Sequence, residues 1–81
     1  MNTELHLQDV IALLEDVPVK HFESGRPFCL HRGQIGTVVM TYTDGTCEVE
    51  FADRDGRAYA ILPIQLDKLM VLHDAPDYAA A

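Results

Sequence analysis

A thiol and two imidazoles lie close together in one segment of this 81-residue chain. Cys29 and His31 are two residues apart, so an extended backbone would place both side chains on one face. His21 precedes them in the same segment. Zinc takes Cys and His ligands in a tetrahedron, and a structural zinc usually has four ligands. The paired spacings typical of such sites are missing, so the three residues are weak metal candidates and loop packing is the alternative.

The Cys29–His31 pair is also the combination used by cysteine nucleophiles. Such catalysis needs a group that orients the base and donors that stabilise an oxyanion, and the sequence marks neither. Cys47 alternates with apolar residues, and we interpret it as a small buried side chain. We therefore predict a protein without catalytic residues, without enzyme activity and without a cofactor.

Several carboxylates follow one another in the second half of the chain: Glu48, Glu50, Asp53 and Asp55. The last two belong to an Asp-x-Asp-Gly motif that begins like a calcium loop, but its twelfth position is Ile64 instead of Glu. Acid–base catalysis by the two glutamates would need a cleft that separates their pKa values. We interpret the glutamates as solvated and the four carboxylates as an acidic face that can dock a basic partner.

Composition sets further limits. Thirteen acidic against six basic residues give a formal net charge of −7, which would repel the phosphates that nucleic-acid binders neutralise with Lys and Arg. No apolar run approaches the roughly 18 residues of a membrane span, and no secretion signal is visible. Two cysteines are too few for a disulfide framework. We expect a reduced, cytoplasmic protein that binds neither nucleic acid nor membrane; its acidity serves solubility or a basic protein partner.

The apolar pattern predicts short strands joined by turns. A continuous apolar run at 10–14 favours a buried strand. Pro18, Gly25 and Pro27 make the segment 17–32 a long loop. Five strands are expected in all, with one helical turn at 64–68 before a last strand at 70–72. Residues 1–8 then form a lead-in, 9–72 the domain and 73–81 a flexible tail.

Two turn motifs fix the expected register of the central strands. Asp44-Gly45 suits a two-residue type I′ turn, which pairs Tyr42 with Cys47, Met40 with Val49 and Val38 with Phe51. A shift by one residue would set Met40 against a glutamate, so the apolar pattern favours this register. The turn at 53–56 suits a type I turn with a glycine bulge, which pairs Phe51 with Tyr59 and Val49 with Ile61. Pro63 is expected to end that strand.

Two motifs carry a resemblance to a known family. The chain from 9 to 72 resembles a family of short bacterial proteins of unknown function, which share Arg-Gly-x-x-Gly-Thr-Val-Val, here 32–39, and Glu-Val-Glu-Phe-x-Asp-x-x-Gly, here 48–56. More distantly, 33–39 is similar to the KOW motif of ribosome- and transcription-associated barrels. The resemblance implies an all-β, five-stranded SH3-like barrel with one helical turn before the last strand. It implies no activity, although genes encoding small proteins beside family members hint at a partner or an antitoxin-like role.

SH3-like domains often bind extended peptides in an aromatic groove beside their first long loop. The candidates here are Phe22, Arg26, Phe28 and Arg32, with core packing of the aromatic residues as the alternative. An exposed strand edge can also pair with a second copy, so homo-oligomer and monomer both stay open. The sequence thus predicts an acidic protein-interaction module. A nucleic-acid-associated KOW-like barrel and a small accessory subunit of a redox enzyme are the rival interpretations.

Overall fold

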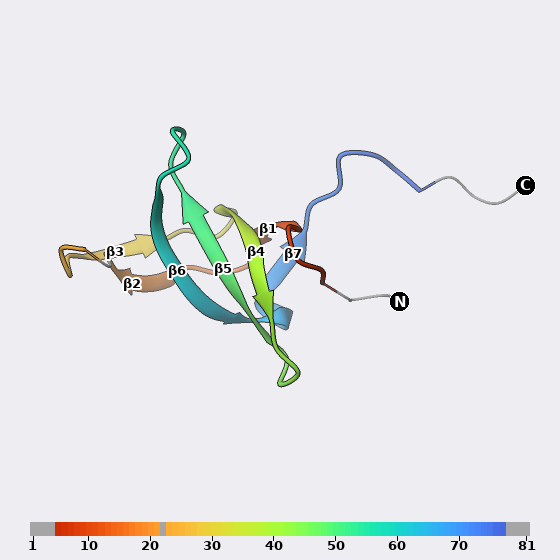
Figure 1. Cartoon of the computed structure of the whole chain (residues 1–81), viewed down its shortest axis with the longest axis horizontal. Helices are drawn as coiled ribbons and strands as arrows, with labels where there is room; N and C mark the ends of the chain where they lie inside the picture. The colour runs from red at the N-terminus through yellow and green to blue at the C-terminus, as the bar shows by residue number, and fades with distance from the viewer. Residues whose placement is uncertain (1–4, 22, 78–81) are drawn as a thin grey trace, which may run out of the picture.

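The computed structural model describes residues 5–21 and 23–77, which form an all-β domain. The elements are β1 (Val10–Leu13), β2 (Val17–Lys20), β3 (Pro27–Leu30), β4 (Ile35–Thr41), β5 (Thr46–Ala52), β6 (Ala58–Gln65), the 3₁₀ turn η1 (Leu66–Lys68) and β7 (Leu69–Val71). Five strands form an antiparallel sheet in the order β6-β5-β4-β1-β7, and β2 and β3 form a separate hairpin (Figure 1). Across the described ranges the sheet keeps two open edges, β6 and β7, instead of closing into a barrel.

The expected all-β class and the short helical turn before the last strand are confirmed. The long loop predicted for 17–32 is wrong, because this segment contains the β2–β3 hairpin. Its side chains alternate between half-buried and exposed, with Val17 and Val19 turned inward, and this period of two is the pattern of a strand. The loop was predicted because Pro18 and Pro27 are unfavourable inside a sheet. A two-stranded hairpin tolerates proline at positions where no neighbouring strand needs its missing N–H group.

The first central hairpin is shifted by one residue from the expected register. Met40 pairs with Glu48 and Thr41 with Cys47, so the predicted pairing of Met40 with Val49 is wrong. A type I′ turn needs positive φ at both central residues, but at this turn only Gly45 has one, at +88°. The Asp44 carboxylate instead accepts hydrogen bonds from the Thr46 N–H and hydroxyl, at 3.1 and 2.6 Å, and these hold a three-residue loop.

A β-bulge in β4 compensates for this shift and returns Val38 to the core. The register changes between Val38 and Met40, which makes Val39 an extra residue in β4. Beyond the bulge Val38 pairs with Val49, and both are completely buried. The expected core position of Val38 is therefore reached through a different pairing, whereas Met40 and Tyr42, both predicted to face the core, are exposed.

The second central hairpin follows the predicted turn and then departs from it. The Asp53 and Arg57 backbones are hydrogen-bonded, and Gly56 has a φ of +82°, as a type I turn with a glycine bulge requires. A second bulge at Tyr59 then pairs Phe51 with Ala60 instead of Tyr59. Strand β6 also continues through Pro63, contrary to the prediction. Because β6 is an edge strand, the missing N–H group of Pro63 costs no ladder bond.

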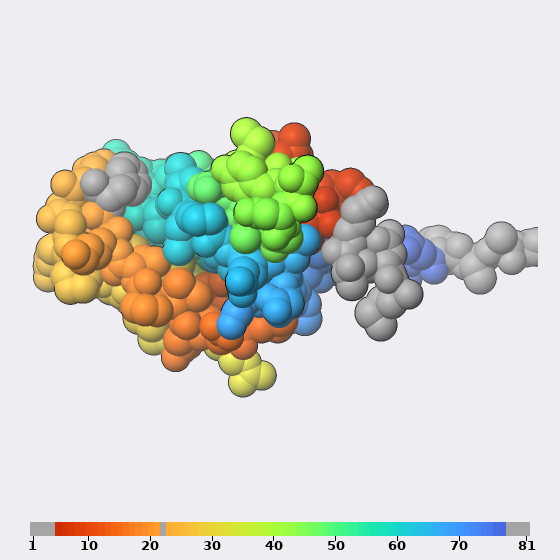
Figure 2. Space-filling view, turned by 90° about the horizontal axis from the view of Figure 1, so that it is seen from below, coloured from red at the N-terminus to blue at the C-terminus, as the bar shows by residue number. Residues whose placement is uncertain are grey.

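One apolar core joins the sheet and the hairpin. Its buried members are Ile11, Leu13, Leu30, Val38, Cys47, Val49, Phe51, Ala60, Ile64 and Leu69. Leu30 comes from β3, so the hairpin is anchored to the sheet. Burial raises the pKa of the Cys47 thiol, and the Glu48 charge adds to the effect; this agrees with the predicted role of Cys47 as a small buried side chain. Figure 2 shows the hairpin, in orange and yellow, at one end of the molecule and β7, in blue, toward the other.

Two glycines of the 32–39 motif serve different purposes. Gly33 has a φ of +92° in a turn closed by a hydrogen bond from the Gln34 N–H to the His31 carbonyl, at 2.8 Å, and only glycine adopts that φ without strain. Gly36 lies on β4 directly against the core. A Cβ at this position would lie 2.6 Å from a Val49 methyl carbon and 2.8 Å from the Phe51 ring. Absence of a side chain at 36 therefore lets β4 approach β5.

We expect Gly36→Ala to lower the free energy of unfolding by about 1–3 kcal/mol, the usual cost of overpacking a core. Urea denaturation measures the change. In a Val49→Ala background the same substitution should cost less, because the nearest clashing methyl is gone. An equal cost in both backgrounds would contradict the close approach as the reason for this glycine.

No described helix is long and apolar enough to cross a membrane.

Candidate functional site

The outer face of the sheet carries an acidic pair surrounded by apolar side chains. Strand β5 turns Cys47, Val49 and Phe51 into the core, so its alternate residues, Glu48 and Glu50, point away from it. Cross-strand pairing defines the neighbours of these carboxylates. We define the outer face as the surface formed by these two glutamates and their cross-strand neighbours: Val10, Thr37, Met40, Glu48, Glu50, Ile61 and Pro63.

The register arranges the outer face in two rows across the strands. One row runs from Ile61 through Glu50 and Thr37 to Val10, on β6, β5, β4 and β1. The other places Glu48 between Pro63 and Met40. Met40 and Ile61 are each 50% exposed and Val10 is 42% exposed. Solvent-exposed apolar groups on both sides of two carboxylates are a feature of interaction surfaces.

The two glutamates are not neutralised within the described part of the chain. No described lysine or arginine forms a salt bridge with either of them; Lys68 pairs with Glu15 instead, at 3.1 Å. The Tyr42 hydroxyl donates a hydrogen bond to a Glu48 carboxylate oxygen at 3.3 Å. The pKa of Tyr42 is raised from its ordinary value by desolvation first and then by the Glu48 charge and hydrogen bond. This surface therefore keeps an excess of negative charge.

Asp53 and Asp55 extend the acidic face only in part, because they belong to the turn between β5 and β6. An Asp53 carboxylate oxygen accepts hydrogen bonds from the Asp55 and Arg57 N–H groups, both at 3.0 Å. Asp53 thus holds the turn, as Asp side chains commonly do. Asp55 is exposed at the tip of the same turn. The structure therefore brings Glu48 and Glu50 together on one face and places the two aspartates at its end.

The candidates predicted in the first loop are distributed along the β2–β3 hairpin. Phe22 lies outside the described residues. Phe28 is half-buried, with its ring centre 6.0 Å from that of Tyr59 in an edge-to-face contact. The Tyr59 ring, at the bulge in β6, thus contacts the hairpin, and the Tyr59 hydroxyl accepts a hydrogen bond at 2.7 Å from the side chain of Gln34 in the β3–β4 turn. Among the described aromatic residues of the hairpin, packing against the sheet is thus the principal role.

Arg26 and Arg32 lie at opposite ends of β3, about 20 Å apart along an extended strand. Arg26 lines an open hollow at the hairpin tip together with His21, Ser24, Pro27 and Phe28. Arg32 lies in the β3–β4 turn, where its N–H donates a hydrogen bond to an Asp16 carboxylate oxygen at 2.7 Å. The two cations therefore do not form one binding patch.

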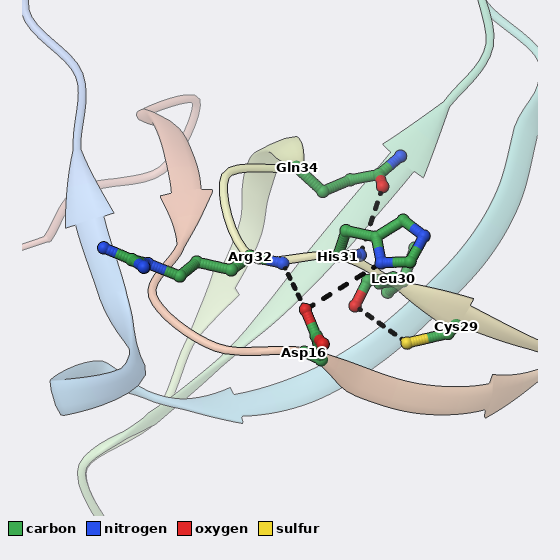
Figure 3. Close-up of polar contacts among 6 residues, drawn as sticks. All are labelled: Asp16, Cys29, Leu30, His31, Arg32 and Gln34. Carbon is green, nitrogen blue, oxygen red and sulfur yellow. Dashed lines mark hydrogen bonds and ion pairs between the residues drawn. The ribbon is translucent and has the colours of Figure 1, made fainter.

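The hairpin also rearranges the predicted metal candidates. Its tip holds His21, whose Nδ1 accepts hydrogen bonds from the Glu23 and Ser24 N–H groups at 3.2 and 3.4 Å. Cys29 and His31 lie toward the other end, where Asp16 joins them (Figure 3). Sequence reasoning missed Asp16 because 17–32 was interpreted as a loop. The alternating apolar residues of 17–20 and 27–30 were the signal that would have paired the two segments.

Comparison with known proteins gives one family. A domain of unknown function, DUF4926, matches residues 7–71. The chain belongs to the DUF4926 family. This membership confirms the resemblance to a family of unknown function. Comparisons with curated proteins and with solved structures give no match.

The contact between Tyr42 and Glu48 predicts a titration effect. Removing the negative charge by Glu48→Gln should move the pKa of Tyr42 downward, toward its ordinary value of 10.0, because both a repulsive charge and a hydrogen bond that stabilises the neutral phenol are weakened. A pH titration of the Tyr42 ring followed by NMR measures the pKa. Glu50→Gln is the matched control and should have a smaller effect. Equal shifts in both variants would contradict the contact.

Proposed function

We propose that this protein is a non-catalytic interaction module whose outer face docks a basic protein segment with apolar side chains beside its Lys or Arg residues. The observation that carries the proposal is the pair Glu48 and Glu50 lying between exposed Met40, Ile61 and Val10. A partner that covers this face would need cations for the two carboxylates and apolar groups for their neighbours. Such charge complementarity gives specificity and accelerates association.

The whole-chain charge supports the same choice of partner. A net charge of −7 attracts basic proteins and repels nucleic acid, for which phosphate neutralisation supplies much of the affinity. The acidic pair lies on the surface of the sheet and does not line the hollow at the hairpin tip. Acid–base catalysis by two carboxylates needs a cleft that separates their pKa values, and an open sheet surface does not provide one. These features support binding over both nucleic-acid recognition and catalysis.

We further propose that the domain is an open relative of the SH3-like barrels. The strand order β6-β5-β4-β1-β7 and the η1 turn before the last strand support this interpretation. The excursion after the first strand, here the β2–β3 hairpin, is another feature of that architecture. Domains of this type commonly act by binding extended peptides, which agrees with an accessory role beside a larger partner, including an antitoxin-like one.

Selection of short random peptides displayed on phage, using the full chain as bait, tests the partner chemistry. We expect the enriched peptides to combine Lys or Arg with Leu, Ile or Phe. The double variant Glu48→Gln/Glu50→Gln should bind them about tenfold or more weakly, because paired and desolvated charges are lost. The matched control Asp74→Asn/Asp77→Asn removes the same charge from the exposed segment after β7 and should bind nearly as well as the parent chain.

Three results would contradict the proposal. The first is enrichment of acidic or proline-rich peptides without cations. The second is an equal loss of binding in the control variant, which would reduce the effect to net charge. The third is a labelled RNA or DNA duplex that binds the parent chain with a strong salt dependence, since this would favour a nucleic-acid-associated barrel.

A further inference from the structure

Three metal-ligating side chains converge on one face of the β2–β3 hairpin. Asp16, Cys29 and His31 each offer one ligand atom, and these atoms all lie within 4.8 Å of one another. The His31 Nδ1 is 3.9 Å from an Asp16 carboxylate oxygen. Figure 3 shows the imidazole and the carboxylate next to each other, with the Cys29 sulfur beside them and the Arg32 side chain directed away. The cluster lies on the hairpin and shares no residue with the outer face.

The hairpin register explains why these residues meet. Val17 pairs with Leu30 and Pro18 with Cys29, so the next pair toward the open end is Asp16 with His31. Cys29 and His31 are two residues apart and therefore point to the same side of an extended strand. Leu30, between them, is buried in the core, which turns both ligands outward. The backbone thus presents all three side chains to solvent on one face.

A backbone hydrogen bond orients the carboxylate. The Arg32 N–H donates to Asp16 Oδ1 at 2.7 Å, and this oxygen is the one that lies 3.9 Å from the His31 Nδ1, so the bond holds the carboxylate beside the imidazole. Bonds of this kind hold metal-binding carboxylates in place. Arg32 is the first residue of the 32–39 motif, so this motif contributes a backbone donor to the cluster as well as a turn to the fold.

We propose that Asp16, Cys29 and His31 form a binding site for Zn²⁺ on the β2–β3 hairpin. A thiolate, an imidazole and a carboxylate are all ligands that zinc accepts, whereas Ca²⁺ and Mg²⁺ select oxygen ligands. In a zinc tetrahedron the ligand atoms lie about 3.5 Å apart, so a shift of about 1 Å by these exposed side chains closes the site. Three protein ligands leave a fourth position for water.

Cobalt is a suitable probe because Co²⁺ occupies zinc sites and reports a bound thiolate through a sulfur-to-metal charge-transfer band. We expect Co²⁺ added to the reduced full chain to give this band, and Zn²⁺ to abolish it by displacement. Cys29→Ser should remove the band. His31→Ala and Asp16→Asn should each weaken Co²⁺ binding by at least about tenfold, because loss of a direct ligand costs no less than loss of an orienting partner.

Matched controls separate this site from adventitious binding. His73→Ala and Asp74→Asn remove the same side-chain types from the segment after β7 and should leave Co²⁺ affinity unchanged. Cys47→Ala removes the other thiol and should keep the band, with circular dichroism confirming that each variant is folded. The proposal is overturned if saturating Co²⁺ gives no charge-transfer band, if the band survives Cys29→Ser, or if His73→Ala weakens binding as much as His31→Ala.

Discussion

The alternation along β5 is the constraint on which the rest of the structure depends. Cys47, Val49 and Phe51 are completely buried, and a strand that buries every second residue must turn the intervening ones outward. The sequence at 47–51 thus places the core and the acidic pair on opposite sides of one strand. Gly36 allows β4 to approach this strand closely, and the two bulges adjust β4 and β6 to it. A shift of β5 by one residue would bury two carboxylates, which is too costly to be tolerated.

The bulges also connect the fold to its candidate sites. The bulge at Val39 returns Val38 to the core after the first turn and leaves Met40 beside Glu48 on the outer face. The bulge at Tyr59 aims its ring at Phe28 on the hairpin. Because this contact and Leu30 fix the hairpin to the sheet, they also fix where Asp16, Cys29 and His31 are held. Bulges often re-aim side chains in this way near functional sites.

Sequence patterns sufficed where one local signal determined the structure. The inward residues of β5, the η1 turn and the glycine turn at 53–56 follow from alternation, length and turn chemistry. The register of the first hairpin could not be predicted from local signals. The Asp44 carboxylate holds a three-residue loop, and the bulge at Val39 in β4 compensates for the resulting shift. Asp16 was missed for a related reason: its place beside His31 depends on pairing across a hairpin whose prolines favoured a loop. Such compensation between distant residues is a tertiary effect.

The outer face is the surface on which we propose that a partner docks. The most direct measurement is the change of backbone amide NMR shifts of the full chain on titration with the tightest peptide from the selection. We expect the largest changes along β5 and β6, at Glu48, Glu50 and Ile61, and little change along β2 and β3. Largest changes on the β2–β3 hairpin, around Arg26 and Phe28, would contradict it.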